Sequence, residues 1–292
     1  MSDLENDYWA LRREMGAVWV PRDFVRATGV DTLSFLQGQL SQDVEKVAVG
    51  ESAWSLLLQP QGKVDAFLRL TRTGDDAFLL DTDGGWGERV LERLNRFKLR
   101  VRCDLEAVPW RCLAVRGPRA HEAADGLPAD WPGLAGVDVV GESPALPDGA
   151  HLCELDAYEA VRIEAGVPAM GRELDEGTIP AEAGIVDRAV SFTKGCFTGQ
   201  ELVARIDSRG GNVPRHLRGV VVQTNVCPPA GASVEVDGKA VGVLTSVAES
   251  FERRAPVALA YVRRAVEPPA EATVSWSDGS APARVEQLPL VS

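Results

Sequence analysis

The sequence predicts an α+β fold that ends in a small antiparallel β-barrel. The first observation is a compact unit between about residues 51 and 109, in which strands are followed by an amphipathic helix and a further strand. The second is a series of short β-rich segments after about residue 213, evenly spaced and separated by turn dipeptides such as Asp237-Gly238. Even spacing with turn residues is typical of barrels.

The periodicity of the compact unit defines its elements. The expected elements are strands at 53–59, 64–70, 77–80 and 101–105 and a helix at 86–99. The helix places Val90, Leu91, Leu94 and Phe97 on one face, the spacing of a helix that packs on a core. Cys103 has the alternation of a core strand residue. The expected barrel strands are 217–223, 233–236, 240–245, 257–262, 272–276 and 283–288.

Caps and turns mark the remaining segments. Residues 1–16 are interpreted as a loosely attached leader, and residues 126–149, rich in Gly and Pro, as a long surface excursion. Asp31 can cap a helix that continues for about nine residues. Asp156 and Glu159 form the D-x-x-E variant of a capping box at the start of a second helix.

Size and charge restrict the function classes. The chain has 292 residues, 45% apolar and 25% charged, as expected for a globular protein of two or three domains. Its net charge of −12 argues against wholesale binding to nucleic acid or to an anionic membrane. Between residues 194 and 218, however, five basic and two acidic residues give a net charge of +3. An anionic ligand would be drawn there, although a solvated loop with ordinary charge scatter is equally consistent. The five basic residues are Lys194, Arg205, Arg209, Arg215 and Arg218.

The cysteines and histidines show no local metal motif. Five cysteines are widely spaced without a CxxC pair, and three histidines are dispersed, so we expect neither a disulfide framework nor a resident metal. The first 13 residues are acidic and lack the apolar run of a secretory signal. No window approaches the ~18 apolar residues of a membrane span. A reducing cytoplasm is the expected location.

One stretch of eight residues, Lys194 to Glu201, contains several chemically different functional groups. It holds a cation, a thiol, an amide and a carboxylate, with Gly195 and Gly199 on either side of Cys196. A short helix is expected from Gln200, so Cys196 would lie just before a helix N-terminus, where the dipole and Lys194 favour the thiolate. A buried cysteine in a structural turn is the alternative, and both interpretations stay open.

Glu164 stands in an unfavourable place on the second helix. Gly166 is expected to end that helix, which puts the carboxylate in the last turn, where it opposes the helix dipole. It therefore needs a partner. Arg162 or Arg172 could form an internal ion pair with it, or a cationic or donor-rich ligand could bind to it.

Several segments together resemble a known family. Residues Lys194 to Glu201 resemble the signature of the YgfZ folate-binding proteins, relatives of the glycine-cleavage T-protein and of a mitochondrial iron–sulfur assembly factor. Phe35-Leu36-Gln37-Gly38-Gln39, Arg162 to Pro168 and Thr178 to Glu182 resemble further family segments in the same order. The resemblance extends over about residues 17–288.

The resemblance implies a three-domain, ring-like GcvT-like fold with a central opening for a reduced folate. The expected domains are a discontinuous folate-binding domain at 17–50 and 110–210, an inserted α+β ferredoxin-like domain at 51–109, and the barrel at 214–288. In T-proteins the residue matching Glu164 hydrogen-bonds the donor edge of the pterin, which would supply its partner. Arg162, Gln200 and Glu201, in the same motifs, are expected at the folate site as well.

The resemblance also implies the chemistry. Cys196 is expected to be the working thiol, with Lys194 tuning it. T-proteins carry paired aspartates where this chain has Asp65 alone, so Asp65 is the only candidate carboxylate for amine chemistry. The expected function is tetrahydrofolate binding in support of iron–sulfur cluster assembly or repair in client enzymes, including those that modify tRNA. The alternatives are a folate-dependent aminomethyltransferase or demethylase, and a scaffold that binds no folate; whether the chain is an enzyme stays open.

Overall fold

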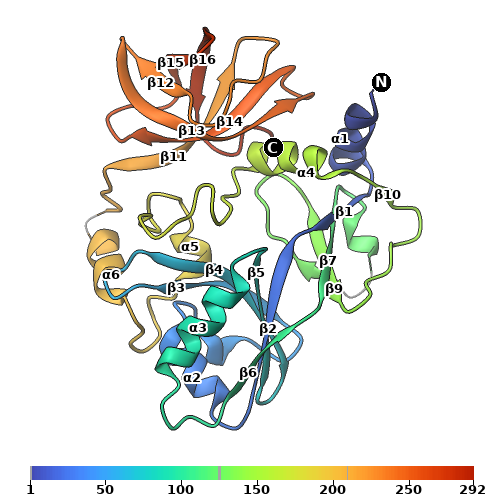
Figure 1. The fold of residues 1–292 in the computed structure, drawn as a ribbon, viewed down its shortest axis with the longest axis vertical. Coiled ribbons are helices and arrows are strands. Elements are labelled where there is room, and N and C mark those ends of the chain that lie inside the picture. Colours follow the sequence, from blue (N-terminus) through green and yellow to red (C-terminus); the bar gives the residue numbers. More distant parts are fainter. Residues whose placement is uncertain (1, 124–125, 209) are drawn as a thin grey trace.

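The fold consists of two five-stranded sheets and a closed six-stranded barrel (Figure 1). A long irregular segment, residues 166–185, runs between the sheets and the barrel. This computed structural model describes residues 2–123, 126–208 and 210–292. The helices are α1 (Asp3–Arg13), α2 (Thr32–Gln39), α3 (Gly87–Phe97), α4 (Leu155–Ala165), α5 (Val186–Ala189) and α6 (Gln200–Ser208), with short 3-10 helices η1 (Val44–Lys46) and η2 (Ala120–Glu122).

The first sheet has the strand order β10-β1-β7-β9-β8. Its strands are β1 (Gly16–Val20), β7 (Arg111–Arg116), β8 (Leu127–Pro128), β9 (Gly136–Gly141) and β10 (His151–Leu152). β9 pairs with β7 along its whole length, so the interpretation of residues 126–149 as a surface excursion was wrong. Buried Asp138 interrupts the apolar pattern of β9, which disguised the strand in the sequence.

The second sheet has the order β3-β4-β5-β2-β6. Its strands are β2 (Arg22–Thr28), β3 (Ser52–Leu58), β4 (Val64–Gly74), β5 (Ala77–Asp83) and β6 (Asp104–Val108). Pro21, which cannot donate to a ladder, separates β1 from β2, and the chain crosses there from one sheet to the other. The second sheet thus includes a strand from before residue 51, and the expected domain boundaries stay a prediction.

The C-terminal barrel closes in the order β11-β14-β13-β12-β15-β16. Its strands are β11 (Arg215–Val222), β12 (Ser233–Val236), β13 (Lys239–Ser250), β14 (Ala255–Arg263), β15 (Ala270–Trp276) and β16 (Gly279–Glu286). Alternate residues such as Val220, Val222 and Val234 are fully buried inside it. The α+β class and the C-terminal antiparallel barrel are confirmed.

The N-terminal segment is an integral part of the fold. Residues 3–13 form α1, which lies beside α4, to the right of the barrel in Figure 1. Tyr8 and Leu11, three residues apart on one helix face, have no exposed surface. The expectation of a loose leader was therefore wrong. The many charged residues in this segment make its narrow apolar face hard to recognise in the sequence.

Two expected helix caps are absent. Asp31 precedes α2 but its side chain makes no capping bond; it accepts instead from the backbone and guanidinium of Arg102, at 2.9 to 3.0 Å. α4 begins at Leu155, so Asp156 lies inside the first turn rather than at the cap. The C-terminus is as expected, since Gly166 ends α4 with a left-handed φ of 72°.

None of the helices among the described residues is long and apolar enough to cross a bilayer.

Candidate functional site

Two adjoining cavities lie where both sheets meet the end of α4. They share Arg22, Asp83, Tyr158, Arg162 and Ala169, and we call the pair the central cavity. The inner part is also lined by Trp54, Phe67, Arg116, Trp131, Asp138, Val167 and Pro168. The outer part has a volume of about 190 Å³ and the inner part about 40 Å³.

Aromatic rings form much of the inner wall. The rings of Trp54 and Phe67 stack with centroids 4.8 Å apart, and Trp131 lies 5.1 Å from Tyr158 in a tilted arrangement. Trp54 and Phe67 come from the neighbouring strands β3 and β4, which fixes their spacing. A wall of this kind suits a flat heteroaromatic ligand.

Buried ion pairs fix the charged side of the cavity. Asp138 pairs with Arg69 and Arg116, each at 2.9 Å, and Asp81 pairs with Arg69 at 3.0 Å and with Arg22 at 2.6 Å. Burial opposes ionisation of Asp138, but Arg116, Arg69 and Arg22 together hold its pKa at about 2. The cavity therefore keeps a fixed arrangement of charges.

Arg188 offers further donors next to the aromatic wall. Its guanidinium carbon lies 4.8 Å from the centroid of the Trp54 ring. Its Nε and Nη2 are buried and have no hydrogen-bond partner among the described residues. Burial lowers the pKa of Arg188 from its usual value. An acceptor supplied by a ligand would complete this group.

Arg162, a predicted site residue, lines both parts of the central cavity. It is held by Glu159 at 2.9 Å and by Glu173 at 3.1 Å, and it donates to the hydroxyl of Ser246 in the barrel at 2.9 Å. The side chain thus joins α4, the irregular segment and the barrel, so it forms a rigid wall rather than a mobile ligand contact.

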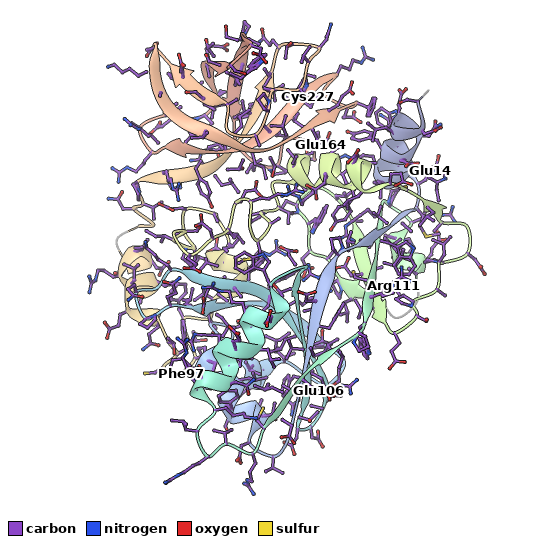
Figure 2. The ribbon with its side chains drawn as sticks, in the orientation of Figure 1. Glu14, Phe97, Glu106, Arg111, Glu164 and Cys227 are labelled. Carbon is purple, nitrogen blue, oxygen red and sulfur yellow. The ribbon has the colours of Figure 1, made fainter. Side chains whose placement is uncertain are left out.

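Glu164, in contrast, is fully enclosed by protein. It has no exposed surface and is not among the residues that line the central cavity. Tyr8 donates to it at 2.6 Å, Arg12 at 2.9 Å, and Ser250 also donates to it. Figure 2 shows Glu164 on α4 beneath the barrel. Its partners are neither Arg162 nor Arg172, and the geometry gives no support to direct contact with a pterin.

The thiol loop, residues 190–199, presents Cys196 at the surface. Cys196 is exposed, which favours the accessible thiol over the buried structural cysteine. α6 begins at Gln200, as expected, and the side chain of Gln200 accepts from the Phe197 amide at 3.1 Å. Gly199 has a φ of 81°, and a Cβ there would lie 2.5 Å from the carbonyl oxygen of Gln59. The loop therefore rests on the turn between β3 and β4.

Lys194 anchors this loop to α2. Its ammonium donates to the carbonyls of Gln37, Leu40 and Gln42 at 2.6, 2.6 and 2.9 Å. Burial lowers the pKa of Lys194 to about 8. The contact brings the end of the Phe35 to Gln39 segment and the thiol loop, which both resemble family motifs, together in space. The tuning of Cys196 by Lys194 stays a prediction.

Lys194→Met should release the thiol loop without unfolding the protein. The variant leaves three carbonyls of the α2 terminus without their donor. We expect amide hydrogen exchange in residues 190–199 to rise at least tenfold, while exchange in the barrel strands stays unchanged. Lys239→Met, at an exposed lysine at the start of barrel strand β13, is the control. Equal exchange in both variants would show that Lys194 is not the anchor.

Asp65 is the least available of the predicted catalytic residues. It is 6% exposed and pairs with Arg89 at 2.6 Å and with Arg93 at 3.2 Å. Two guanidinium groups on one carboxylate stabilise its charged form and occupy its lone pairs. The geometry gives Asp65 a role in holding α3 against β4.

The positive window is dispersed in the structure. Arg215 pairs with Glu182 at 3.1 Å, Glu201 lies exposed in the first turn of α6, and Arg209 lies outside the described residues. The arginines of the central cavity, Arg22, Arg116 and Arg162, come from other segments. No local sequence pattern indicates that these three arginines converge, because they are far apart in the chain.

Two segments of the chain match two known domains. The GCVT N-terminal domain matches residues 5–131, and the glycine cleavage T-protein C-terminal barrel domain matches residues 215–292. The chain belongs to the GcvT-like superfamily. The superfamily part of the sequence resemblance is thereby confirmed, and the GcvT-like fold with it.

Known proteins resemble this GcvT-like chain over most of its length. An uncharacterized protein from Haemophilus influenzae is 27% identical over 76% of this chain and 80% of its own. Proteins named aminomethyltransferase from Streptomyces avermitilis and Lysinibacillus sphaericus are 28% and 26% identical, over 86% and 84% of this chain and 78% and 77% of their own.

A solved structure shares the fold. The glycine cleavage system aminomethyltransferase T from Bartonella henselae superposes with a TM-score of 0.84 at 23% identity, covering 99% of this chain and 89% of its own. At that identity the likeness is one of fold.

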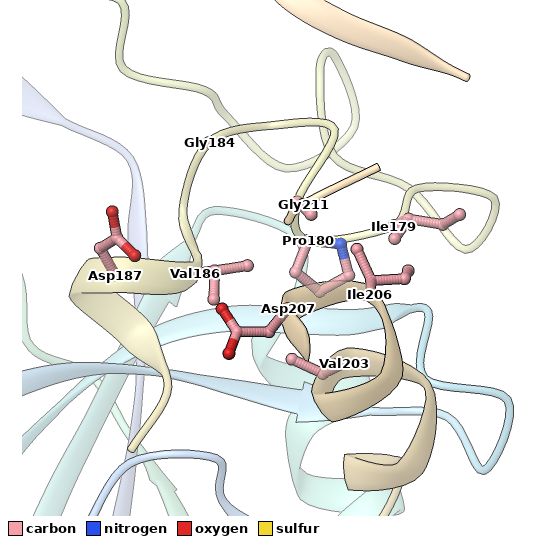
Figure 3. A pocket seen from close by; sticks show the side chains of 10 residues that line it. Ile179, Pro180, Gly184, Val186, Asp187, Val203, Ile206, Asp207 and Gly211 are labelled. Carbon is pink, nitrogen blue, oxygen red and sulfur yellow. The ribbon is translucent and has the colours of Figure 1, made fainter. Parts of the chain in front are cut away.

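A further cavity of this GcvT-like chain lies beside α6 (Figure 3). Pro180, Val186, Val203 and Ile206 make it largely apolar, and the carboxylate of Asp207 lies among them. None of the described residues that line it carries a positive charge, unlike those of the central cavity.

Proposed function

We propose that this GcvT-like protein binds tetrahydrofolate or a derivative in the central cavity and supports iron–sulfur cluster assembly or repair in client enzymes, with Cys196 as the working thiol. The observation that carries the proposal is the composition of the cavity, in which an aromatic wall, carboxylates and several guanidinium groups converge. Few ligands match all three features.

A reduced folate matches each feature. Its pterin is flat and can lie against Trp54 and Phe67. The pterin presents a ring N–H and an amino group side by side, and a carboxylate can accept from both. Asp83 lines the cavity with a side chain that is 32% exposed; its oxygens each accept one hydrogen bond, from Arg22 at 3.1 Å and from the Met170 amide at 2.8 Å, and keep further lone pairs for a ligand. Arg188, whose Nε and Nη2 have no partner among the described residues, suits the acidic tail.

Cys196 does not line this cavity, and the loop that carries it contacts the turn at the end of the cavity's strands. The thiol loop rests on the β3–β4 turn, and Phe67 is three residues along β4 from Val64. A strand rises ~3.3 Å per residue, so the turn and the cavity wall are ~10 Å apart. A single exposed thiolate can hold iron only transiently unless a partner supplies other ligands. This arrangement favours exchange with a client protein, and the resemblance of the motif to YgfZ proteins supports it.

Arg188→Met should weaken tetrahydrofolate binding about ten- to a hundredfold, the effect of losing one charged hydrogen-bonding anchor worth ~1.5–3 kcal/mol. Anaerobic calorimetry measures the affinity. Arg205→Met, on exposed α6, is the matched control and should bind as the wild type does. Unchanged affinity in Arg188→Met would place the ligand elsewhere.

A folate-dependent aminomethyltransferase is the second candidate, favoured by the names of two relatives. The carboxylate that such chemistry needs is engaged here, because Asp65 pairs with both Arg89 and Arg93. We therefore expect no turnover when an aminomethylated or methylated donor is incubated with tetrahydrofolate and the wild-type protein. Steady turnover that is lost in Asp65→Asn would favour this candidate instead.

A further inference from the structure

A cluster of three different donor groups lies away from the central cavity, where α1 meets β10. It consists of Asp7, His151 and Cys153. One carboxylate oxygen, one imidazole nitrogen and the thiol sulfur all lie within 4.8 Å of one another. Asp7 is 144 residues from His151 in the chain, so no sequence spacing could reveal the cluster.

The backbone around the cluster is fixed. The amides of His151 and Cys153 donate to the carbonyls of Met15 and Ala17 at 2.9 and 2.8 Å, in register with β1. The two residues are separated by one position in extended chain, so both side chains project to the same side. Asp7 is held from α1.

Hydrogen bonds already orient the donors. Asp7 Oδ2 accepts from the Glu154 amide at 2.8 Å, and Asp7 Oδ1 lies 2.8 Å from His151 Nε2. The Cys153 sulfur lies 3.5 Å from the carbonyl oxygen of Asp7 and 3.3 Å from that of His151, and its single proton can be donated to either. Asp7 and Cys153 are buried, whereas the His151 side chain is 50% exposed. The site is thus enclosed on the protein side and open to solvent along the imidazole.

We propose that Asp7, His151 and Cys153 form a binding site for a divalent transition metal of the zinc class. Sulfur, imidazole nitrogen and one carboxylate oxygen are the ligand types that Zn²⁺, Fe²⁺ and Co²⁺ accept. Mg²⁺ and Ca²⁺ require oxygen ligands and do not fit. Three protein ligands leave a fourth position for water on the exposed side.

Binding requires no redox change. The thiol releases its proton to solvent and the thiolate binds the metal, while neutral His151 carries its ring proton on Nδ1 and binds through Nε2. Asp7 exchanges its contact with the imidazole for a contact with the metal and keeps the Glu154 amide. The ion would fasten α1 to β10, one residue before Tyr8, which contacts Glu164. The site is independent of the proposed folate function.

Anaerobic titration with Co²⁺ tests the proposal. The two exposed thiols would also bind cobalt, so the full chain carries Cys196→Ser and Cys227→Ser as a background. We expect about one Co²⁺ per chain, a thiolate-to-cobalt charge-transfer band, displacement by Zn²⁺ and no effect of Mg²⁺. Adding Cys153→Ser should abolish the band.

Because Cys153 is buried, its variant could fail to fold, and His151→Gln at the exposed ligand provides a second test. It should weaken Co²⁺ binding at least tenfold. His121→Gln, an exposed histidine elsewhere, is the control and should change nothing. Absence of the band in the background protein, its persistence in Cys153→Ser, or unchanged affinity in His151→Gln would each overturn the proposal.

Discussion

Glu164→Ala is expected to destabilise the protein by about 3–5 kcal/mol, the usual cost of breaking a buried ion pair by removing one partner. The carboxylate is fully buried and receives hydrogen bonds from Tyr8, Arg12 and Ser250. Without it the Arg12 charge, whose side chain is 6% exposed, stays buried without its partner. Urea denaturation followed by circular dichroism measures the change.

Two control variants separate the effect of losing the buried charge from the effect of losing its hydrogen bonds. Glu164→Gln keeps an acceptor for Tyr8 and should lose less stability than the alanine variant. Burial, and then the neighbouring Glu164 carboxylate, raise the pKa of Tyr8, so the tyrosine remains a donor in both proteins at neutral pH. Glu122→Ala removes an exposed ion pair with Arg119 and should have no measurable effect. A loss below about 1 kcal/mol in Glu164→Ala would contradict the buried network.

Cys196→Ser is expected to abolish the in-cell function while leaving the fold intact. The thiol is exposed, so its replacement should change the free energy of unfolding by less than about 0.5 kcal/mol. In cells that lack the native gene, the activity of an iron–sulfur enzyme should be restored by the wild type and not by this variant, at matched expression.

Cys227→Ser is the matched control, because Cys227 is the second exposed cysteine and lies in the barrel half of the chain. It should restore the enzyme activity fully. Full restoration by Cys196→Ser would show that the thiol is dispensable, whereas loss in both variants would point to a general effect of removing surface thiols.

Local patterns predicted much of the fold. The helix at 87–97, the hairpin of β3 and β4, and the six barrel strands follow from periodicity and turn residues, which act over a few residues. Buried polar residues caused the failures. Asp138 in β9 and the charged residues of β2 and α1 break the apolar pattern because their partners come from distant parts of the chain.

The candidate site was predicted in part. The thiol loop and Arg162 were found through their motifs, and the loop's anchor on the Gln37 to Gln42 segment links two of those motifs. Asp83, Asp138 and Arg188 were missed. Charged residues inside otherwise apolar strands, such as Asp81 in β5, were the available signal, since a buried charge requires a partner or a ligand.

The central claim is that a reduced folate occupies the central cavity. Hydrogen exchange of the wild-type protein, with and without saturating tetrahydrofolate under anaerobic conditions, tests it most directly. The account predicts protection in β3, β4, the end of α4 and α5, with the barrel strands unchanged. No protection anywhere, or protection confined to α6 and the apolar cavity beside it, would contradict it.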